Sequence, residues 1–185
     1  MKTIRKYLAG RLSLFLLLLA LSLSALSQEP YVPGDPVLPD YLRQVTLYRT
    51  DGSRTTLGAV LDSLAGRVVF IDFWASWCSP CLREMSYSKA LQQHFSGKEV
   101  AFLYLSTNSD RGSWLKGMER IGMPGHHYRI EPLEKNRFKK YFRIPGIPYY
   151  VILGRQGKVF LADAPWPHDK QCRKKIEEAG KNEEF

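Results

Sequence analysis

The feature that most constrains the fold is an apolar run at residues 68–73 that leads into two cysteines, Cys78 and Cys81. The run is rich in β-branched and aromatic residues, and Asp72 is its only charge. This pattern is typical of a central strand in a parallel sheet that is covered on both faces. Residues 79–95 follow with apolar residues at helical spacing and without glycine. The stretch therefore predicts a buried strand that delivers two cysteines to the start of a helix.

The predicted helix start favours a reactive Cys78. Pro80 would lie in the first turn, where a proline is tolerated because its missing N–H has no intrahelical partner. The unpaired backbone N–H groups and the positive end of the helix dipole would favour the Cys78 thiolate. Such cysteines have pKa values lowered from about 8.5 to roughly 3.5–7.5. We therefore expect a nucleophile at neutral pH.

The spacing of the two cysteines favours redox chemistry over a structural crosslink. Two cysteines separated by two residues enclose too small a loop to hold a fold together. Cys78 precedes the helix, so we expect it to be the better exposed cysteine and to attack a disulfide. Cys81 lies one turn further in, within bonding reach, and would resolve the mixed disulfide.

The first 27 residues have the organisation of a secretory signal. A basic segment at 1–11 contains no acid, a leucine-rich segment follows at 12–26, and small residues precede Gln28. The uncharged run of roughly 15 residues is short for a membrane span of about 20. We expect cleavage and export to the periplasm, and a retained membrane anchor is the competing interpretation.

Charge argues against a nucleic-acid partner. The chain has 27 Lys and Arg against 18 Asp and Glu, and four of the basic residues belong to the predicted signal. The remaining charges are scattered instead of gathered into a basic patch. Export would place the paired cysteines in an oxidising compartment.

The length of 185 residues suits one domain. We predict a cleaved signal at 1–27, an extended proline-rich leader at 28–43, one domain at 44–180 and a tail at 181–185. The elements expected within the domain are a hairpin turning at 51–52, a helix at 57–64, the strand and helix described above, a strand at 99–107, a helix at 110–121 capped by Ser109 or Asp110, a loop at 122–129, a helix at 132–142, strands at 147–153 and 158–162, and a helix at 169–179.

The segment from Asp72 to Cys81, Asp-Phe-Trp-Ala-x-Trp-Cys-x-Pro-Cys, resembles the active-site segment of thioredoxin-fold proteins. Residues 44–180 resemble exported thiol-disulfide oxidoreductases of the TlpA/ResA type. The resemblance implies an α/β thioredoxin fold, with a central mixed sheet flanked by helices, an N-terminal β-hairpin extension and a helical insertion before the cis-proline strand. Ser79 and Ser86 depart from the glycine and the helix-kinking proline that many relatives have at these positions.

The resemblance also implies roles for residues outside the cysteine pair. An acid stands at the position of Asp72 in thioredoxins, and a carboxyl group buried in an apolar strand has a raised pKa. We expect Asp72 to exchange a proton with Cys81; the alternative is a hydrated carboxylate at the rim of the strand. The family implies a cis peptide at Ile147-Pro148, whereas the sequence alone is equally compatible with a trans turn. The expected substrate-contacting residues are Trp77, Pro80, Ile147 and Pro148.

Together these features predict an exported protein-disulfide oxidoreductase that acts as a reductase, as related proteins do in cytochrome c maturation. Its partners would be protein thiols and disulfides and a membrane-bound electron donor, with membrane contact only through an uncleaved signal. No cofactor is expected beyond the Cys78–Cys81 disulfide. A peroxiredoxin-like peroxidase and a non-catalytic module that binds thiol proteins are the alternatives.

The other residues with possible site chemistry carry less weight. His126 and His127 are adjacent and cannot readily converge on one ion, so we expect no metal. Cys172 is an unpaired cysteine in the last predicted helix. We expect it to be a buried small hydrophobe; the alternatives are a third redox partner and an intermolecular disulfide.

Overall fold

The protein was analysed as a computed structural model that describes residues 30–31 and 37–184. The predicted signal at 1–27 and part of the predicted leader lie outside the described residues. From Tyr31 onward the chain forms one compact unit. Among the described residues, no helix is both long enough and apolar enough to span a bilayer.

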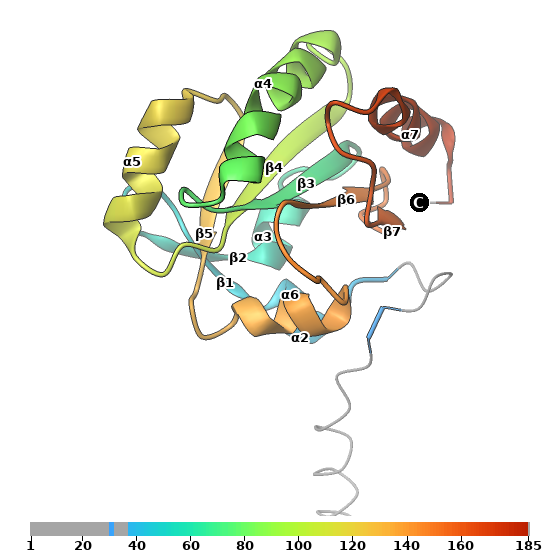
Figure 1. Ribbon diagram of the computed structural model, residues 1–185. Coiled ribbons are helices and arrows are strands. Elements are labelled where there is room, and N and C mark those ends of the chain that lie inside the picture. The colour runs from blue at the N-terminus through green and yellow to red at the C-terminus, as the bar shows by residue number, and fades with distance from the viewer. Residues whose placement is uncertain (1–29, 32–36, 185) are drawn as a thin grey trace, which may run out of the picture. The chain divides into compact units, whose positions relative to one another are not determined.

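A single mixed sheet of seven strands has the order β2-β1-β5-β4-β3-β6-β7 (Figure 1). Strand β4 runs parallel to both β3 and β5, and the other neighbouring pairs are antiparallel. The predicted amino-terminal hairpin and the hairpin beyond the active-site strand are therefore both confirmed. The strands are β1 (Thr46–Tyr48), β2 (Arg54–Thr56), β3 (Val68–Trp74), β4 (Val100–Ser106), β5 (His126–Ile130), β6 (Tyr149–Leu153) and β7 (Val159–Ala162).

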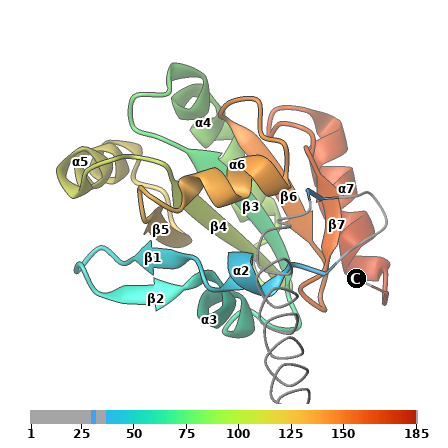
Figure 2. The same cartoon turned by 90° about the horizontal axis from the view of Figure 1, so that it is seen from below.

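Helices cover both faces of the sheet, so the predicted thioredoxin fold is confirmed. Helices α4, α5 and α7 pack on one face, and α2, α3 and α6 pack on the other (Figures 1 and 2). The helices are α2 (Asp40–Arg43), α3 (Leu57–Asp62), α4 (Ser79–His94), α5 (Arg111–Ile121), α6 (Lys135–Tyr141) and α7 (Lys170–Lys181).

Strand β3 divides its side chains between the two layers. Val69, Ile71 and Phe73 enter the core on the α2, α3 and α6 side. Phe70 and Trp74 enter the core on the α4, α5 and α7 side. Because alternate side chains of a strand share a face, Asp72 lies on the face that α4 covers.

The predicted loop at 122–129 is wrong in its second half, because residues 126–130 form strand β5. Nothing in the pattern of two histidines, a tyrosine and an arginine indicates a strand, but β5 pairs with β4 on one side and β1 on the other. His127 stacks on Tyr104 of β4 with ring centroids 4.6 Å apart. Gly125, with φ +117°, lets the chain enter the sheet. The neighbouring strands therefore decide the conformation here.

The predicted start of the domain at residue 44 is also too late. Residues 40–43, predicted as extended leader, form the short helix α2. Leu38 and Leu42 are buried in the core beneath α6 and α3. The domain therefore includes at least the last part of the leader, because two leucines of that segment complete its core.

Candidate active site

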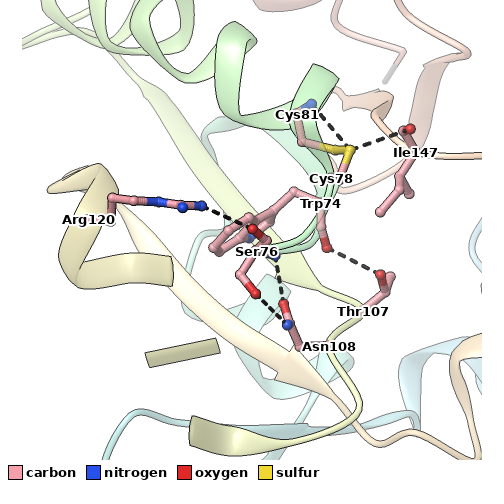
Figure 3. Close-up of a disulfide and its surroundings, with 8 residues drawn as sticks. All are labelled: Trp74, Ser76, Cys78, Cys81, Thr107, Asn108, Arg120 and Ile147. Atoms are coloured by element: carbon pink, nitrogen blue, oxygen red, sulfur yellow. Dashed lines mark hydrogen bonds between the residues drawn. A yellow bond between two sulfur atoms is a disulfide. The ribbon is translucent and has the colours of Figure 1, made fainter. Parts of the chain in front are cut away.

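Cys78 and Cys81 lie where the sequence places them, between β3 and α4, and form a disulfide (Figure 3). Cys78 is the N-cap of α4, and its Sγ accepts a hydrogen bond of 3.2 Å from the backbone N–H of Cys81. Pro80 lies in the first turn of the helix and is half-buried. A backbone donor at the helix start therefore points at the Cys78 sulfur, which is the arrangement that stabilises a thiolate.

Both sulfurs are largely covered by protein. Cys78 is 4% exposed and Cys81 is 1% exposed, so the expected order of exposure holds but the difference is small. Trp77, immediately before the pair, is 69% exposed. An exposed aromatic residue therefore lies directly beside the buried cysteine pair.

The wall opposite the disulfide comes from the segment before β6. The carbonyl oxygen of Ile147 lies 3.6 Å from the Sγ of Cys78 (Figure 3). The peptide bond between Ile147 and Pro148 is cis. Ile147 is half-buried and Pro148 is buried. The four residues predicted to contact substrate thus belong to two segments that are far apart in sequence: Trp77 and Pro80 stand close to Cys78 in the chain, and Ile147 and Pro148 belong to the segment that approaches its sulfur.

A hydrogen-bond network holds the loop that precedes the disulfide (Figure 3). The Oδ1 of Asn108 accepts a 2.9 Å bond from the backbone N–H of Ser76, and the Asn108 Nδ2 donates a 2.7 Å bond to the Ser76 Oγ. Arg120 donates to the Ser76 carbonyl at 3.0 Å. The backbone N–H of Thr107 donates to the carbonyl of Trp74 at 2.8 Å. The loop after β4 and the end of α5 therefore fix the backbone just ahead of Cys78.

Sequence reasoning missed Asn108 and Arg120. The only available signal for Asn108 was its position just past the end of a buried strand, where open α/β sheets place their sites. Arg120 gave no signal, because an arginine in the last turn of a helix is common and favourable there.

Asp72 is inside the protein, 1% exposed, and is not a hydrated carboxylate at the rim. It stands in register with Tyr104 on β4 and Tyr150 on β6. Neither carboxyl oxygen has a hydrogen-bond partner among the described residues. Burial, followed by the negative charge of Glu84, raises the pKa of Asp72 well above its usual value. The group therefore favours its protonated form at a pH where an exposed aspartate is charged.

Glu84 is a second buried carboxylate, and sequence reasoning missed it as well. It lies on α4, one turn beyond Cys81, and is 5% exposed. The Nδ1 of His168 donates to its Oε1 at 2.8 Å, and the His168 backbone N–H donates to its Oε2 at 3.1 Å. A charged residue on the apolar face of the predicted helix was the signal that could have found it.

The remaining cysteine and the paired histidines do not extend the site. Cys172 is a free, fully buried cysteine of α7, and burial raises the pKa of its thiol to about 12. Burial lowers the pKa values of His126 and His127 in β5. Within the described ranges, no three metal-ligating side chains come together.

Comparison with known proteins places the chain in a family. The family model described as thioredoxin-like matches residues 66–159. A thiol-disulfide oxidoreductase, ResA, from Geobacillus kaustophilus is 26% identical over 54% of this chain, and the ResA of Bacillus subtilis is 31% identical over 60%. The matches span 55% and 58% of those two proteins, respectively.

Solved structures show the same fold. The thioredoxin domain of a thiol-disulfide oxidoreductase from Bacteroides vulgatus superposes with a TM-score of 0.62 at 20% identity, covering 72% of this chain and 91% of that one. A thiol-disulfide oxidoreductase from Bacteroides fragilis gives a TM-score of 0.61 at 22% identity, covering 72% and 94%. With the family match, these findings confirm the resemblance seen in the sequence. The chain belongs to the thioredoxin-like family and is similar to its TlpA/ResA type.

Proposed function

We propose that this protein exchanges disulfides with cysteines of other proteins, acts in the reducing direction, and does so after export. The observation that carries the proposal is the Cys78–Cys81 disulfide at the start of α4, with the Ile147 carbonyl 3.6 Å from the Cys78 sulfur. The names of the ResA relatives support the chemistry. The predicted signal at 1–27 supports export.

In the first step, the Cys78 thiolate attacks one sulfur of a substrate disulfide. A bond forms between the Cys78 sulfur and that substrate sulfur as the substrate S–S bond breaks. The other substrate sulfur leaves as a thiolate and takes a proton from solvent. The helix start and the Cys81 backbone N–H stabilise the charge on Cys78 before the attack.

In the second step, Cys81 attacks the Cys78 sulfur and releases the remaining substrate sulfur as a thiolate. The Cys81 thiol exchanges its proton with Asp72 through a water molecule, and the ionised form of Asp72 is the acceptor. The raised pKa of Asp72 brings its proton affinity closer to that of a thiol, which makes this transfer easier than to an exposed aspartate. Two electrons move from the protein dithiol to the substrate. The product state is the disulfide that the structure contains.

The surface around the disulfide would hold the substrate chain in an extended conformation. The backbone next to Pro148 can pair with such a segment, as peptides pair with exposed strand edges in other proteins. Trp77 and Pro80 would shape the opposite side. The dithiol itself stores the two electrons, so the cycle needs no further cofactor, and a membrane-bound donor would restore the reduced form.

Replacing Cys78 by serine tests the proposal. We expect Cys78→Ser to abolish reduction of a protein disulfide while near-UV circular dichroism shows an intact fold, because the attacking sulfur is gone. Cys81→Ser should accumulate mixed disulfides through Cys78, since the second step is blocked. Cys172→Ala is the matched control and should keep full activity. Undiminished activity in Cys78→Ser would contradict the proposal.

A measured reduction potential tests the direction separately. A reductase should have a potential near that of thioredoxin, about −270 mV, which lies below those of oxidising family members at about −180 to −120 mV. Equilibration with glutathione buffers, followed by thiol counting, gives the value. A reduction potential in the higher range would contradict the proposed reducing direction but would remain compatible with the proposed disulfide exchange.

A further inference from the structure

A pocket of about 270 Å³ opens beside the disulfide, on the face of the sheet that α6 covers. Two of its lining residues belong to the walls already described, because Trp77 precedes Cys78 and Ile147 approaches the Cys78 sulfur. The pocket is therefore continuous with the place where a substrate disulfide must lie. Its lining also includes Phe73, Ile130 and Phe138 and, from α6, Lys135 and Lys139.

The size and lining of the pocket suit one side chain of a polypeptide. Small-molecule sites usually occupy about 300–1,000 Å³, so this pocket lies just below that range. Phe138 is 2% exposed, and with Phe73 and Ile130 it gives the pocket an apolar interior. An apolar side chain near a substrate cysteine would lose its contact with water there.

The rim of the pocket on α6 is positively charged. Lys135 and Lys139 are four residues apart, so they lie on the same side of the helix. In the part of the chain that the structure describes, neither lysine forms an ion pair. Both can therefore pair with groups of a partner.

The acidic residues near this helix already have other partners. Glu134 accepts from the backbone N–H of Thr46 at 2.7 Å and pairs with Arg137 at 3.3 Å. Glu131 accepts from the hydroxyl of Tyr48 at 2.5 Å. Glu131 and Glu134 therefore form no ion pair with Lys135 or Lys139, and both ammonium groups remain available to an acidic partner.

We propose that this pocket selects substrates. It binds an apolar side chain close to the reacting cysteine of a disulfide-bearing polypeptide, and Lys135 and Lys139 bind acidic residues that follow this side chain in the substrate sequence. The proposal rests on the function proposed above and adds the substrate class. Selection acts before the exchange step and changes neither the atoms transferred nor the two electrons passed.

Single-turnover reduction of synthetic peptides tests this selection. Pre-reduced protein is mixed with one of three disulfide-bridged peptides of equal length. Each peptide carries a leucine two residues beyond one of its cysteines. The two residues after this leucine are both Glu, both Gln or both Lys. A fourth peptide has the two Glu but serine in place of leucine. Hydroxyethyl disulfide, which is small and neutral, reports the intrinsic reactivity of the dithiol.

We expect the second-order rate constant for the Glu peptide to exceed that for the Lys peptide by about tenfold at low salt, as two partly exposed charge pairs allow. The difference should largely disappear at 1 M salt, where the screening length is about 3 Å. Replacing leucine by serine should lower the rate severalfold, because the pocket then receives no apolar group.

A charge-matched pair of variants isolates the two lysines. The double variant Lys135→Glu/Lys139→Glu should reverse the preference between the Glu and Lys peptides. The control Lys140→Glu/Lys170→Glu changes the net charge equally but alters no residue of the pocket, and it should keep the wild-type preference. The control should reduce hydroxyethyl disulfide at the wild-type rate, and the peptide rates of each variant are compared as ratios to its own rate with hydroxyethyl disulfide.

The outcomes separate the two proposals. Equal rates for all peptides, with normal reduction of hydroxyethyl disulfide, would overturn the substrate selection alone. Loss of preference in the control as strong as in the Lys135/Lys139 variant would also overturn it, because net charge would then be the cause. Failure to reduce hydroxyethyl disulfide as well as the peptides would refute the proposed oxidoreductase function itself.

Discussion

At the scale of single residues, the buried Asp72 affects the proton affinity of its neighbours as well as its own. It lies between two tyrosines of neighbouring strands, and burial together with its carboxylate raises the pKa of both Tyr104 and Tyr150. No described residue donates a hydrogen bond to its oxygens. A charged Asp72 is therefore costly to the fold, and such a cost is more readily explained by a role in proton transfer than by one in stability.

Asp72→Asn should make the protein more stable at neutral pH. Folded Asp72 holds its proton more tightly than unfolded Asp72, so the free energy of unfolding decreases as pH rises from the unfolded pKa, about 4, through the raised folded pKa. Asparagine has no such penalty. Each tenfold change in proton affinity corresponds to about 1.4 kcal/mol.

Urea unfolding between pH 4 and pH 8 measures this effect. The stability of wild type and variant should converge near pH 4 and separate as pH rises. Glu119→Gln, which changes an exposed carboxylate without an ion pair among the described residues, should follow wild type throughout. A variant less stable than wild type at pH 8 would show that Asp72 stabilises the fold.

His168 is predicted to stabilise the buried Glu84. His168→Ala removes the hydrogen bond from Nδ1 and leaves a carboxylate, 5% exposed, with only the backbone donor. We expect a loss of about 1–3 kcal/mol in the free energy of unfolding. His94→Ala removes a half-exposed pair with Glu177 and should cost less than about 1 kcal/mol. Equal losses in the two variants would argue against a special role for His168.

At the scale of elements, α5 supports the active-site loop through close packing as well as hydrogen bonds. Gly117 faces this loop, and an added Cβ would lie 2.5 Å from the Cβ of Ser76 and 3.4 Å from the ring of Trp74. Real side chains do not tolerate the shorter distance. Glycine is thus required at Gly117 for α5 to approach the loop that carries the disulfide.

Gly117→Ala should therefore disturb the active site. Either α5 or Ser76 must move, at a cost of about 1–3 kcal/mol, and the equilibrium of the cysteine pair with glutathione should shift. Gly112→Ala, in the same helix, meets its nearest atom at 3.4 Å and should be neutral or up to about 1 kcal/mol more stable. Denaturant unfolding and glutathione equilibration report the two effects, and an unchanged Gly117→Ala protein would show that the helix can retreat freely.

At the scale of the whole molecule, the core extends beyond the domain expected from the sequence. Leu42 of α2 is fully buried among residues of α3, α6 and the sheet. Residues 37–43 therefore belong to the domain and contribute to its core. This location was hidden in the sequence because the prolines around it are typical of a linker.

Leu42→Ala should cost about 2–5 kcal/mol of unfolding free energy, as removal of a buried leucine side chain does elsewhere. Leu133→Ala deletes the same atoms from a side chain that is 89% exposed, so it should change stability by less than about 0.5 kcal/mol. Thermal and urea unfolding of both variants measure these changes in stability. A neutral Leu42→Ala would mean that α2 is dispensable for the fold.

The sequence by itself determined the central strand, the cysteine pair and the helix that begins at the pair. These features depend on local rules: the side-chain period of a strand, the tolerance for proline in a first helical turn, and the capping of α5 by Asp110, which accepts from the Ser113 N–H as expected. The family motif added the fold and the Ile147-Pro148 segment. Local patterns and a specific motif sufficed because neither depends on which distant residues meet.

Only the tertiary structure decided which residues surround the disulfide. Asn108 reaches Ser76 across 32 residues, Ile147 reaches Cys78 across 69, and His168 reaches Glu84 across 84. Strand β5 exists because β4 and β1 flank it. These contacts depend on strand order and helix packing, which bring together residues that carry no signal of one another in the sequence.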